Sequence, residues 1–526
     1  MHDVDVVVVD GGGGGRGREE MHFLIVSGAA QGQITPARRL ARALVAAQPG
    51  VRATMAVPLS ALRRMFPGKA AEGGAAGEGA VVFSDGAGVD YAAFTDGFDD
   101  GFRPEQCDGA VFVGRLQLVG PASLARLAAA LRARGRPVTC VVYTLLLPFA
   151  AAVARDLDVP AYFFWTMPAA VLSVYYHYFH GRHGLVDAAA GVHDDPDRRV
   201  EVPGLEFLRA RDLPSLLTGP SPYLPAFREM FHVVESTAAA SCHGKSGAKP
   251  RVLVNTFDAL EPEALASVPG IDLLPVGPMV TDAEADDGGG DLFQQDDNNG
   301  YMQWLDKQDD ASVVYVAFGS LAVLSARQLE EIRQCLDVAG RPYLWVVRRD
   351  NRDGGGRDGD ACAAPAGGVV VEWCSQPRVL AHRAVGCFVT HCGWNSTLET
   401  VACGVPAVMA PQWSDQATNA RMAEARWGVG VRAEAAADGT VPSSELARCI
   451  DAVMGDSDDA RAIRHRARQW KARAAMALSV GASTDIDGNA TAARNLRRFL
   501  QGVDREQASS AELTRGQRGN LPQVKG

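Results

Sequence analysis

The segment His391-Cys-Gly-Trp-Asn-Ser396 carries several hydrogen-bond donors and lies between an apolar run and a helix-forming stretch. In an open α/β sheet, ligands bind beyond the carboxyl ends of the strands. Free N–H groups at a helix N-terminus favour a diphosphate, and Gly393 lets the backbone approach one closely. His391, Asn395 and Ser396 can add side-chain donors. The alternative is structural: Ser396 caps the helix and Glu399 completes a Ser-x-x-Glu capping box.

Two neighbouring positions could recognise other parts of the same ligand. Trp373 offers a flat aromatic face for stacking, although it could instead be a core residue at a strand end. Asp415 and Gln416 lie just before a predicted helix, where Asp415 could serve only as an N-cap. A carboxylate and an amide together can accept and donate hydrogen bonds across vicinal hydroxyls.

Alternating strands and helices must position these residues. Apolar runs predict strands, and periodic stretches flanked by Ser, Pro or Gly predict helices. Ser325 is a candidate N-cap with Gln328 as its capping-box partner. In the second half we expect strands at 312–318, 343–347, 385–390 and 406–410, and helices at 325–339, 396–403, 416–426, 459–478 and 491–500.

The first half shows the same alternation, which is typical of a parallel sheet covered by helices. Pro36 suits the first turn of a helix. We expect strands at 22–27, 51–57, 109–113, 138–143, 160–165 and 251–256, and helices at 37–47, 121–134 and 148–157.

Composition narrows the classes of protein. The chain has 526 residues, 47% of them hydrophobic, which is enough for two large α/β domains. The net charge is −10, whereas proteins that bind nucleic acids usually carry an excess of basic residues, so we do not expect nucleic-acid binding. The 10 cysteines form no CxxC pair and no metal-ligand spacing, so we expect reduced thiols and no metal. No signal peptide or membrane span is predicted, so we expect a cytoplasmic protein. We also expect a monomer whose partners are small molecules.

The 44 residues from Trp373 to Gln416 carry the most specific signal, WCSQPRVLAHRAVGCFVTHCGWNSTLETVACGVPAVMAPQWSDQ. This segment resembles the signature of plant family 1 UDP-glycosyltransferases, the plant secondary-product glycosyltransferases. The stretches VVYTLLLP and PGLEFLRARDLPSLL are similar to the subgroup of indole-acetate, other carboxylate and anthocyanin glucosyltransferases.

The resemblance implies a GT-B fold, in which two Rossmann-like α/β domains face each other across a cleft. It implies inverting transfer of a sugar from a UDP-sugar, without a cofactor. Gln416 and Trp394 are similar to glucose-using members, so UDP-glucose is the expected donor. The residues implied in UDP-sugar binding are Ser320, Trp373, Cys374, Gln376, His391, Trp394, Asn395, Ser396, Glu399, Asp415 and Gln416.

Composition and the resemblance together predict these domain limits: a disordered extension at 1–20, an acceptor-binding domain at 21–270 and a linker at 271–300. A UDP-sugar-binding domain at 301–485, a returning helix at 486–502 and a loose tail at 503–526 complete the predicted organisation. Within the linker, residues 281–300 are acidic and Gly-rich, as expected for a connecting segment.

Two positions depart from the family pattern. Gln33 occupies the position of the usual catalytic His, and Thr144 that of its supporting Asp. Glutamine can form hydrogen bonds but cannot take up a proton near neutral pH. His177 or His180 could replace the missing general base. His22 lies at the start of a predicted strand, and we expect it to have a structural role.

Three hypotheses follow from these departures. The acceptor could be a carboxylate, already ionised at neutral pH, so that transfer forms a glucose ester. The chain could instead be a catalytically weak or inactive UDP-sugar-binding protein. It could also act slowly on hydroxyls, since loss of a general base costs about 10²–10⁴-fold. A nicotinamide-dependent dehydrogenase is disfavoured because no GxGxxG with a suitably placed acidic residue follows the first strand.

Overall fold

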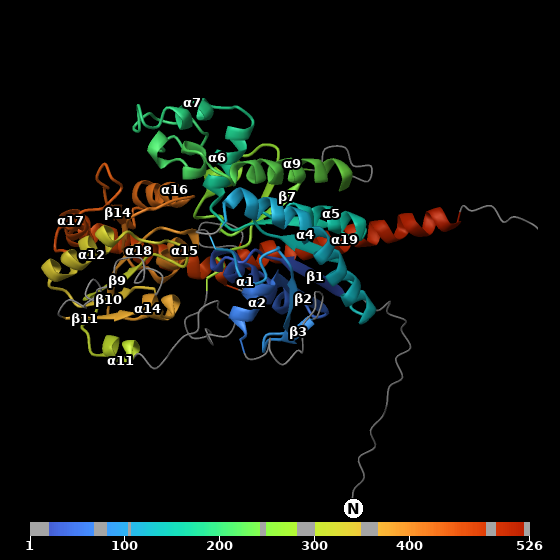
Figure 1. Cartoon of the computed structure of the whole chain (residues 1–526), viewed down its shortest axis with the longest axis horizontal. Helices are drawn as coiled ribbons and strands as arrows, with labels where there is room; N and C mark the ends of the chain where they lie inside the picture. The colour runs from blue at the N-terminus through green and yellow to red at the C-terminus, as the bar shows by residue number, and fades with distance from the viewer. Residues whose placement is uncertain are drawn as a thin grey trace, which may run out of the picture.

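The computed structural model describes residues 20–67, 81–103, 107–241, 249–280, 300–348, 367–479 and 491–519. Their strands form two sheets, each covered by helices (Figure 1). The predicted extension up to residue 19 and the Gly-rich segment 281–299 lie outside the described residues.

The first sheet has eight strands in the order β3-β4-β2-β1-β5-β6-β7-β8, all parallel except for the antiparallel pair β3 and β4. The strands are β1 Met21–Val26, β2 Val51–Pro58, β3 Val81–Ser84, β4 Val89–Phe94, β5 Cys140–Tyr143, β6 Ala161–Trp165, β7 Arg251–Val254 and β8 Asp272–Pro275.

The apolar run of β1 shows why this sheet is buried on both faces. Successive side chains of a strand point to opposite faces. Phe23 and Ile25 belong to one hydrophobic core, and Leu24 and Val26 belong to another. Because both faces of this strand are covered, its sequence is a continuous apolar run, as is typical of parallel strands in α/β proteins.

The second sheet has six parallel strands in the order β11-β10-β9-β12-β13-β14. They are β9 Val313–Ala317, β10 Tyr343–Val346, β11 Gly368–Val371, β12 Val385–Thr390, β13 Ala407–Met409 and β14 Gly430–Arg432. In each sheet the chain starts at a central strand, builds outward, and then returns to its other side. The switch points lie between β1 and β5 and between β9 and β12.

Helices connect the strands of both sheets. Those of the first half are α1 Gln31–Ala47, α2 Leu59–Met65, α4 Gly109–Ala133, α5 Phe149–Asp156, α6 Ala169–Phe179, α7 Leu185–Ala190, the 3-10 helix η1 Ala210–Asp212, α8 Ser215–Thr218, α9 Leu224–Ser241 and α10 Pro262–Ala266. Those of the second half are α11 Tyr301–Asp306, α12 Ala326–Ala339, α14 Gln376–Ala381, α15 Trp394–Cys403, α16 Gln416–Arg421, the π-helix η3 Met422–Arg426, α17 Ser443–Met454 and α18 Asp458–Leu478.

The last helix, α19 Ala492–Gly519, returns to the first sheet and extends from the body of the molecule (Figure 1). Phe499 is fully buried and its ring lies 6.0 Å from that of Phe23. Further along, Tyr162 donates a hydrogen bond of 2.8 Å to Glu506. The sequence predicts a loose tail from residue 503, whereas α19 continues as a helix to Gly519. Its contact with the first sheet through Glu506 lies beyond the predicted limit. The other domain limits stay predictions.

Several predicted elements differ in their limits. Helix α1 begins at Gln31 and contains Pro36, so the predicted start at 37 is too late. The expected strand at 109–113 is instead the first part of α4, which runs through Pro121. A short apolar run does not by itself distinguish a strand from a buried helix segment. By contrast, Ser325 caps α12 as predicted, because its side chain accepts a hydrogen bond from the Gln328 N–H.

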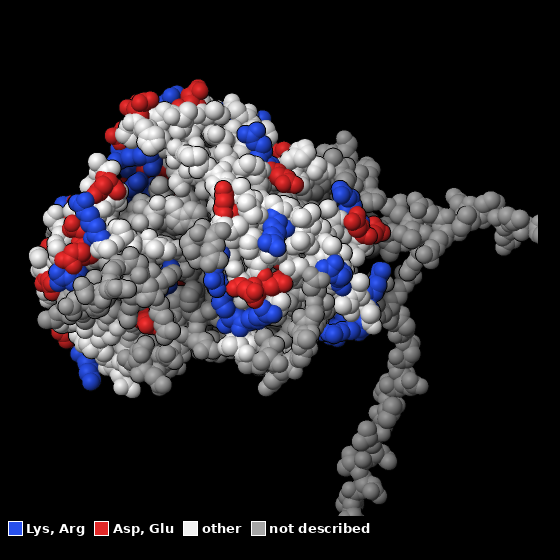
Figure 2. Space-filling model, in the orientation of Figure 1, with Lys and Arg blue, Asp and Glu red and all other residues white. Residues whose placement is uncertain are grey.

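On the face shown in Figure 2, acidic and basic side chains are interspersed. No helix in the described part of the chain is long and apolar enough to cross a membrane.

Candidate active site at the switch points of the two sheets

One cavity lies where the two switch points face each other. The segment after β1 and the residues Leu145, Thr166 and Met167 line it from the first half. The loops after β9, β11, β12 and β13 line it from the second half. Ligands in open α/β sheets bind at these strand ends, so the topology itself places the candidate site.

All residues predicted to bind the UDP-sugar line this cavity: Ser320, Trp373, Cys374, Gln376, His391, Trp394, Asn395, Ser396, Glu399, Asp415 and Gln416. Gln33 lines it too, from the opposite half. Their roles in binding stay predictions, whereas their convergence is a structural observation.

His391 lies between two glycines. A Cβ atom at Gly319 or at Gly393 would lie 2.5 Å from atoms of the His391 ring, so both positions must lack a side chain. Burial, and secondarily the positive charge of Arg348, lower the pKa of His391 to about 4. The ring is therefore neutral at pH 7 and can donate one N–H to an anion.

The backbone around His391 adds further donors. Helix α15 begins at Trp394, and Gly393 precedes it without a side-chain cap. Its first N–H groups are thus available to a bound anion. Ser320 follows β9 on the other side of the switch point and also lines the cavity. This arrangement can hold a diphosphate.

The capping-box interpretation of Ser396 and Glu399 is wrong. Both residues lie inside α15, and their side chains accept hydrogen bonds of 2.9 and 2.7 Å from Gln376 Nε2. Glu399 Oε1 also lies 3.8 Å from Arg39 Nη2 of α1, across the cavity. Arg39 was not predicted from the sequence, because a cation within a helix has no distinguishing spacing.

Trp373 is not part of the core. It follows β11, is half-buried, and lines the cavity, which leaves it accessible for stacking. Its neighbour Cys374 is 5% exposed and lies 3.4 Å from Tyr315 Oη. Burial raises the pKa of Cys374 to about 12, so this residue contributes a neutral thiol.

Asp415 and Gln416 have fixed side chains. Asp415 precedes α16, but its side chain makes no capping hydrogen bond, so the N-cap interpretation is wrong. Its Oδ2 accepts a bond of 2.8 Å from Asn419 Nδ2, and burial raises its pKa to about 6. Gln416 Oε1 accepts bonds of 2.8 and 3.1 Å from the N–H groups of Gln412 and Trp413.

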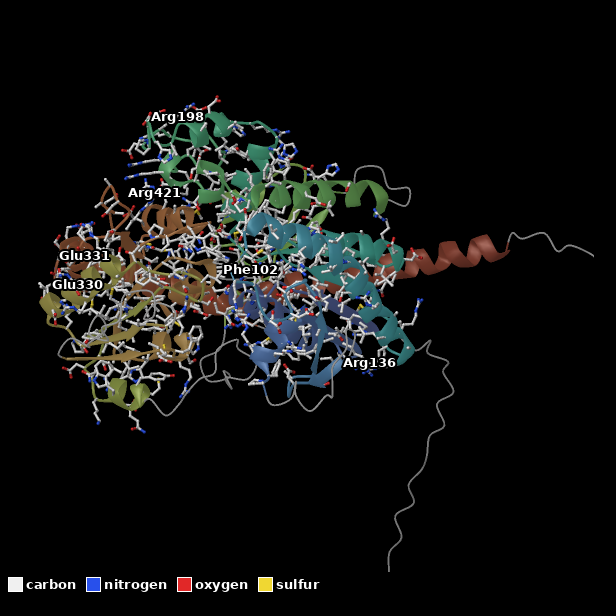
Figure 3. The ribbon with its side chains drawn as sticks, in the orientation of Figure 1. Phe102, Arg136, Arg198, Glu330, Glu331 and Arg421 are labelled. Atoms are coloured by element: carbon white, nitrogen blue, oxygen red, sulfur yellow. The ribbon has the colours of Figure 1, made fainter. Side chains whose placement is uncertain are left out.

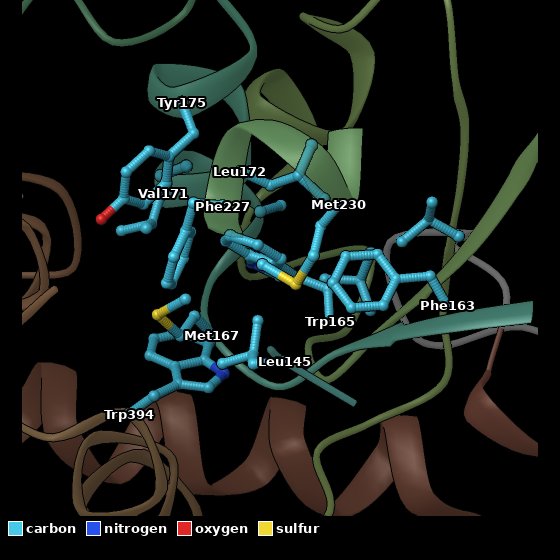
Figure 4. Close-up of a cluster of buried hydrophobic side chains, with 14 of the residues drawn as sticks. Leu145, Phe163, Trp165, Met167, Val171, Leu172, Tyr175, Phe227, Met230 and Trp394 are labelled. Atoms are coloured by element: carbon cyan, nitrogen blue, oxygen red, sulfur yellow. The ribbon is translucent and has the colours of Figure 1, made fainter. Parts of the chain in front are cut away.

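Apolar side chains line the cavity beside the polar residues described above. Trp394 packs beside Leu145 and Met167, and all three line the cavity (Figure 4). Trp394 is 4% exposed, and its indole N–H donates a bond of 2.7 Å to the Asn255 carbonyl. It therefore joins the two halves as well as lining the site.

Gln33 forms a fixed pair with Thr144. The Thr144 hydroxyl donates a bond of 2.8 Å to Gln33 Oε1, and the Gly28 N–H donates one of 3.3 Å to the same oxygen. Because a backbone N–H can only donate, the atom facing Gly28 must be the amide oxygen. Among the described residues, Gln33 Nε2 has no hydrogen-bond partner. The cavity therefore meets a hydrogen-bond donor at this position, not a base.

The alternative bases do not reach the cavity. His22 is 2% exposed, and its ring nitrogens lie within hydrogen-bond distance of the Arg136 carbonyl and Thr54, as expected for a structural residue. His177 Nε2 lies 3.0 Å from the Ser267 carbonyl, and His180 Nε2 lies 3.1 Å from Glu235. Neither lines the site, so the hypothesis that one of them replaces the base is not supported.

The fold and the site together define a protein of two Rossmann-like halves with a cavity between them that can hold a nucleoside diphosphate. The family model of the UDP-glucoronosyl and UDP-glucosyl transferases matches residues 280–467. The chain is 38% identical to the chloroplastic crocetin glucosyltransferase of Gardenia jasminoides, over 92% of this chain and 97% of that protein. It is also 38% identical to the phloretin 4'-O-glucosyltransferase of Malus domestica, over 91% and 97%.

A solved structure agrees with these matches. The crystal structure of Os79 from O. sativa in complex with UDP has a TM-score of 0.74 and 29% identity, and covers 91% of this chain and all of the other. The chain therefore belongs to the plant UDP-glycosyltransferases, and the predicted GT-B fold is confirmed.

Proposed function

We propose that this chain transfers glucose from UDP-glucose to a carboxylate group of a small plant metabolite and so forms a glucose ester. The observation that carries the proposal is the hydrogen-bonded pair of Gln33 and Thr144. The Gln33 oxygen is occupied by two donors, so its amide N–H groups are left for the acceptor. A carboxylate accepts such hydrogen bonds in its ionised state and has no proton to lose.

The reaction is balanced without a base. A carboxylate oxygen attacks C1 of glucose with its electron pair, and the bond from C1 to the diphosphate oxygen breaks. UDP departs with that electron pair, and inversion at C1 follows from attack opposite the leaving group. Stabilising the departing diphosphate is then the main task of the protein. Neutral hydroxyl acceptors would still require proton removal, which neither Gln33 nor Thr144 can perform near neutral pH.

The proposed donor contacts follow the geometry of the cavity. The half-buried Trp373 would stack on uracil, and Gln376 with Glu399 would face the ribose. The carboxylate and amide of Asp415 and Gln416 would meet the sugar hydroxyls. The proposed diphosphate contacts are Ser320, His391, Asn395, Ser396 and the N-terminus of α15.

Similarity to the relatives does not indicate which class of acceptor this chain uses. Their names cover crocetin, phloretin and, in Perilla frutescens, an anthocyanidin 3-O-glucoside. The acceptor class is therefore argued from Gln33 alone. The predicted cytoplasmic location also remains a proposal, since one of these relatives is named as chloroplastic.

One acceptor tests the proposal directly. 4-Hydroxybenzoate offers an ionised carboxylate and a neutral phenol in the same molecule, so the two acceptor groups compete at equal concentration. With purified protein and UDP-glucose at pH 7, we expect UDP release and a monoglucoside that mild alkali hydrolyses, as an ester requires. An alkali-stable phenolic glucoside as the main product would overturn the carboxylate assignment.

A second candidate function is that of a UDP-sugar-binding protein without turnover, favoured by the same replacement of both proton-handling residues. In that case UDP-glucose binds saturably, and no acceptor yields product. Turnover that appears only in Gln33→His would support this alternative, and ester formation by the wild type would exclude it.

A further inference from the structure

The loop that carries Asp415 is held by a residue of the other half of the chain. The Ser215 N–H donates a hydrogen bond of 2.8 Å to the Ser414 carbonyl. In return, the Ser414 N–H donates one of 2.6 Å to the Ser215 hydroxyl. Ser215 is the first residue of α8, so both polar groups of the Ser414 backbone are satisfied from the first half.

Ser414 needs this support because its backbone is strained. Its φ is +61°, in the left-handed region that residues with a side chain rarely adopt. Such conformations persist only where surrounding contacts determine them, and they concentrate at ligand sites. Asp415 and Gln416 follow Ser414 directly, so the conformation of Ser414 sets where their side chains begin.

Further hydrogen bonds join the same two segments, the one that precedes Ser215 and the one that follows Ser414. Asp212 of η1 is 1% exposed, and its carboxylate accepts a hydrogen bond of 2.7 Å from Arg432 of β14. Its carbonyl accepts one of 2.6 Å from Thr418 of α16. Arg421, at the end of α16 and labelled in Figure 3, donates a hydrogen bond of 3.2 Å to the Phe207 carbonyl. The segment from 207 to 215 thus docks against the helix that follows the loop.

We propose that Ser215 is a positioning residue for the donor sugar. Through Ser414, it holds Asp415 and Gln416 at the orientation in which they meet the sugar hydroxyls. The first half of the chain thereby contributes to selection of the donor sugar, although it does not carry the sugar contacts. This inference rests on the proposed assignment of Asp415 and Gln416 to the sugar.

The test compares two ligands that differ only in the sugar. Ser215→Ala removes the acceptor of the Ser414 N–H and keeps the backbone hydrogen bond. We expect the dissociation constant of UDP-glucose, measured by calorimetry, to rise about fivefold, as for the loss of one hydrogen bond of about 1 kcal/mol. The dissociation constant of UDP should stay within about twofold, because removal of the hydroxyl leaves its proposed contacts in place.

Two further variants control for folding. Ser215→Thr keeps a hydroxyl and should bind UDP-glucose like the wild type. Ser236→Ala removes an exposed hydroxyl that donates a hydrogen bond to the Val233 carbonyl of its own helix, and should change the binding of neither ligand. Equal weakening of UDP and UDP-glucose in Ser215→Ala, or no weakening of either, would overturn the inference.

Gln416→Ala separates this inference from the proposed function. If Gln416→Ala binds UDP-glucose as tightly as the wild type, the assignment of the sugar contacts fails and the role of Ser215 fails with it. If Gln416→Ala weakens UDP-glucose selectively while Ser215→Ala does not, the sugar contacts stand and only the role of Ser215 is refuted. Selective weakening in both variants supports both.

Discussion

The hydroxyl of Thr144 donates a hydrogen bond of 2.8 Å to the side-chain oxygen of Gln33, although the two residues are 111 positions apart. They meet because β1 and β5 pair in parallel with Val26 opposite Tyr143, so the segments after both strands emerge at the same edge. The pair occupies the positions where the family resemblance implies a His and an Asp. It keeps the hydrogen bond between the two positions but cannot accept a proton.

Restoring a base should therefore extend the acceptor range. We expect Gln33→His to raise the rate with phenolic acceptors, and Gln33→His with Thr144→Asp to raise it further, because an aspartate can orient the imidazole and stabilise its charged form. The gain should lie within the range of about 10²–10⁴-fold for general-base catalysis. It is measured as kcat/KM for a phenol at pH 7.5.

The rate with a carboxylic acid is the matched control for that experiment. It should not rise in either variant, because an ionised nucleophile has no proton to remove. An equal gain with the acid and the phenol would mean that the substitution acts on binding or folding rather than on proton transfer.

The pH dependence of donor binding should follow Asp415. Burial raises its pKa to about 6. Sugar hydroxyls donate to the ionised carboxylate, so a bound sugar favours the charged form and lowers this pKa. The affinity for UDP-glucose should therefore be highest above pH 6 and fall as the pH drops through about 6. Calorimetric titrations between pH 5 and pH 8 would show this.

Asp415→Asn provides the comparison, because the amide has the same shape and does not titrate. The ratio of wild-type to variant affinity removes the contributions of other groups, including the nucleotide. A ratio that stays constant across this pH window would show that Asp415 does not bind the donor as a carboxylate.

The ion pair between Arg39 and Glu399 links the two halves at the cavity. Its nitrogen and oxygen lie 3.8 Å apart, and the side chains are only 13% and 7% exposed. We expect Arg39→Gln and Glu399→Gln each to weaken UDP binding. A double-mutant cycle should give a coupling of about 0.5–3 kcal/mol, as residues in contact do.

Arg42 is the control on the same helix. It pairs with Asp85 at 3.0 Å and does not line the cavity, so Arg42→Gln should leave UDP binding unchanged. Additive effects of Arg39→Gln and Glu399→Gln would show that the two residues act on the nucleotide independently.

Trp394 lines the cavity, and its indole N–H should also stabilise the folded protein. Trp394→Phe removes the donor and leaves the buried Asn255 carbonyl without that partner. We expect a loss of about 1–3 kcal/mol in the free energy of unfolding, measured with urea. Trp304→Phe, at a half-buried Trp whose N–H has no partner among the described residues, should cost less. Equal losses would contradict a role for the hydrogen bond.

Many of the strands and helix ends could be predicted from local residue patterns. The apolar runs of β1, β9 and β12 are visible because strands buried on both faces have few polar positions. Ser325 and Gly404 mark helix ends through local chemistry, a side-chain cap and a left-handed backbone. Where local preference was ambiguous, as in α4, the prediction was wrong.

The sequence by itself indicated the candidate donor residues and their class of ligand, because one segment of consecutive strand ends and helix starts carries all of them except Ser320. Only the tertiary structure decided what Gln33 and Ser414 contact. Thr144 is 111 residues from Gln33, and Ser215 is 199 residues from Ser414. Hydrogen bonds over such separations depend on how two sheets pair, twist and dock, and no local pattern of residue types encodes that geometry.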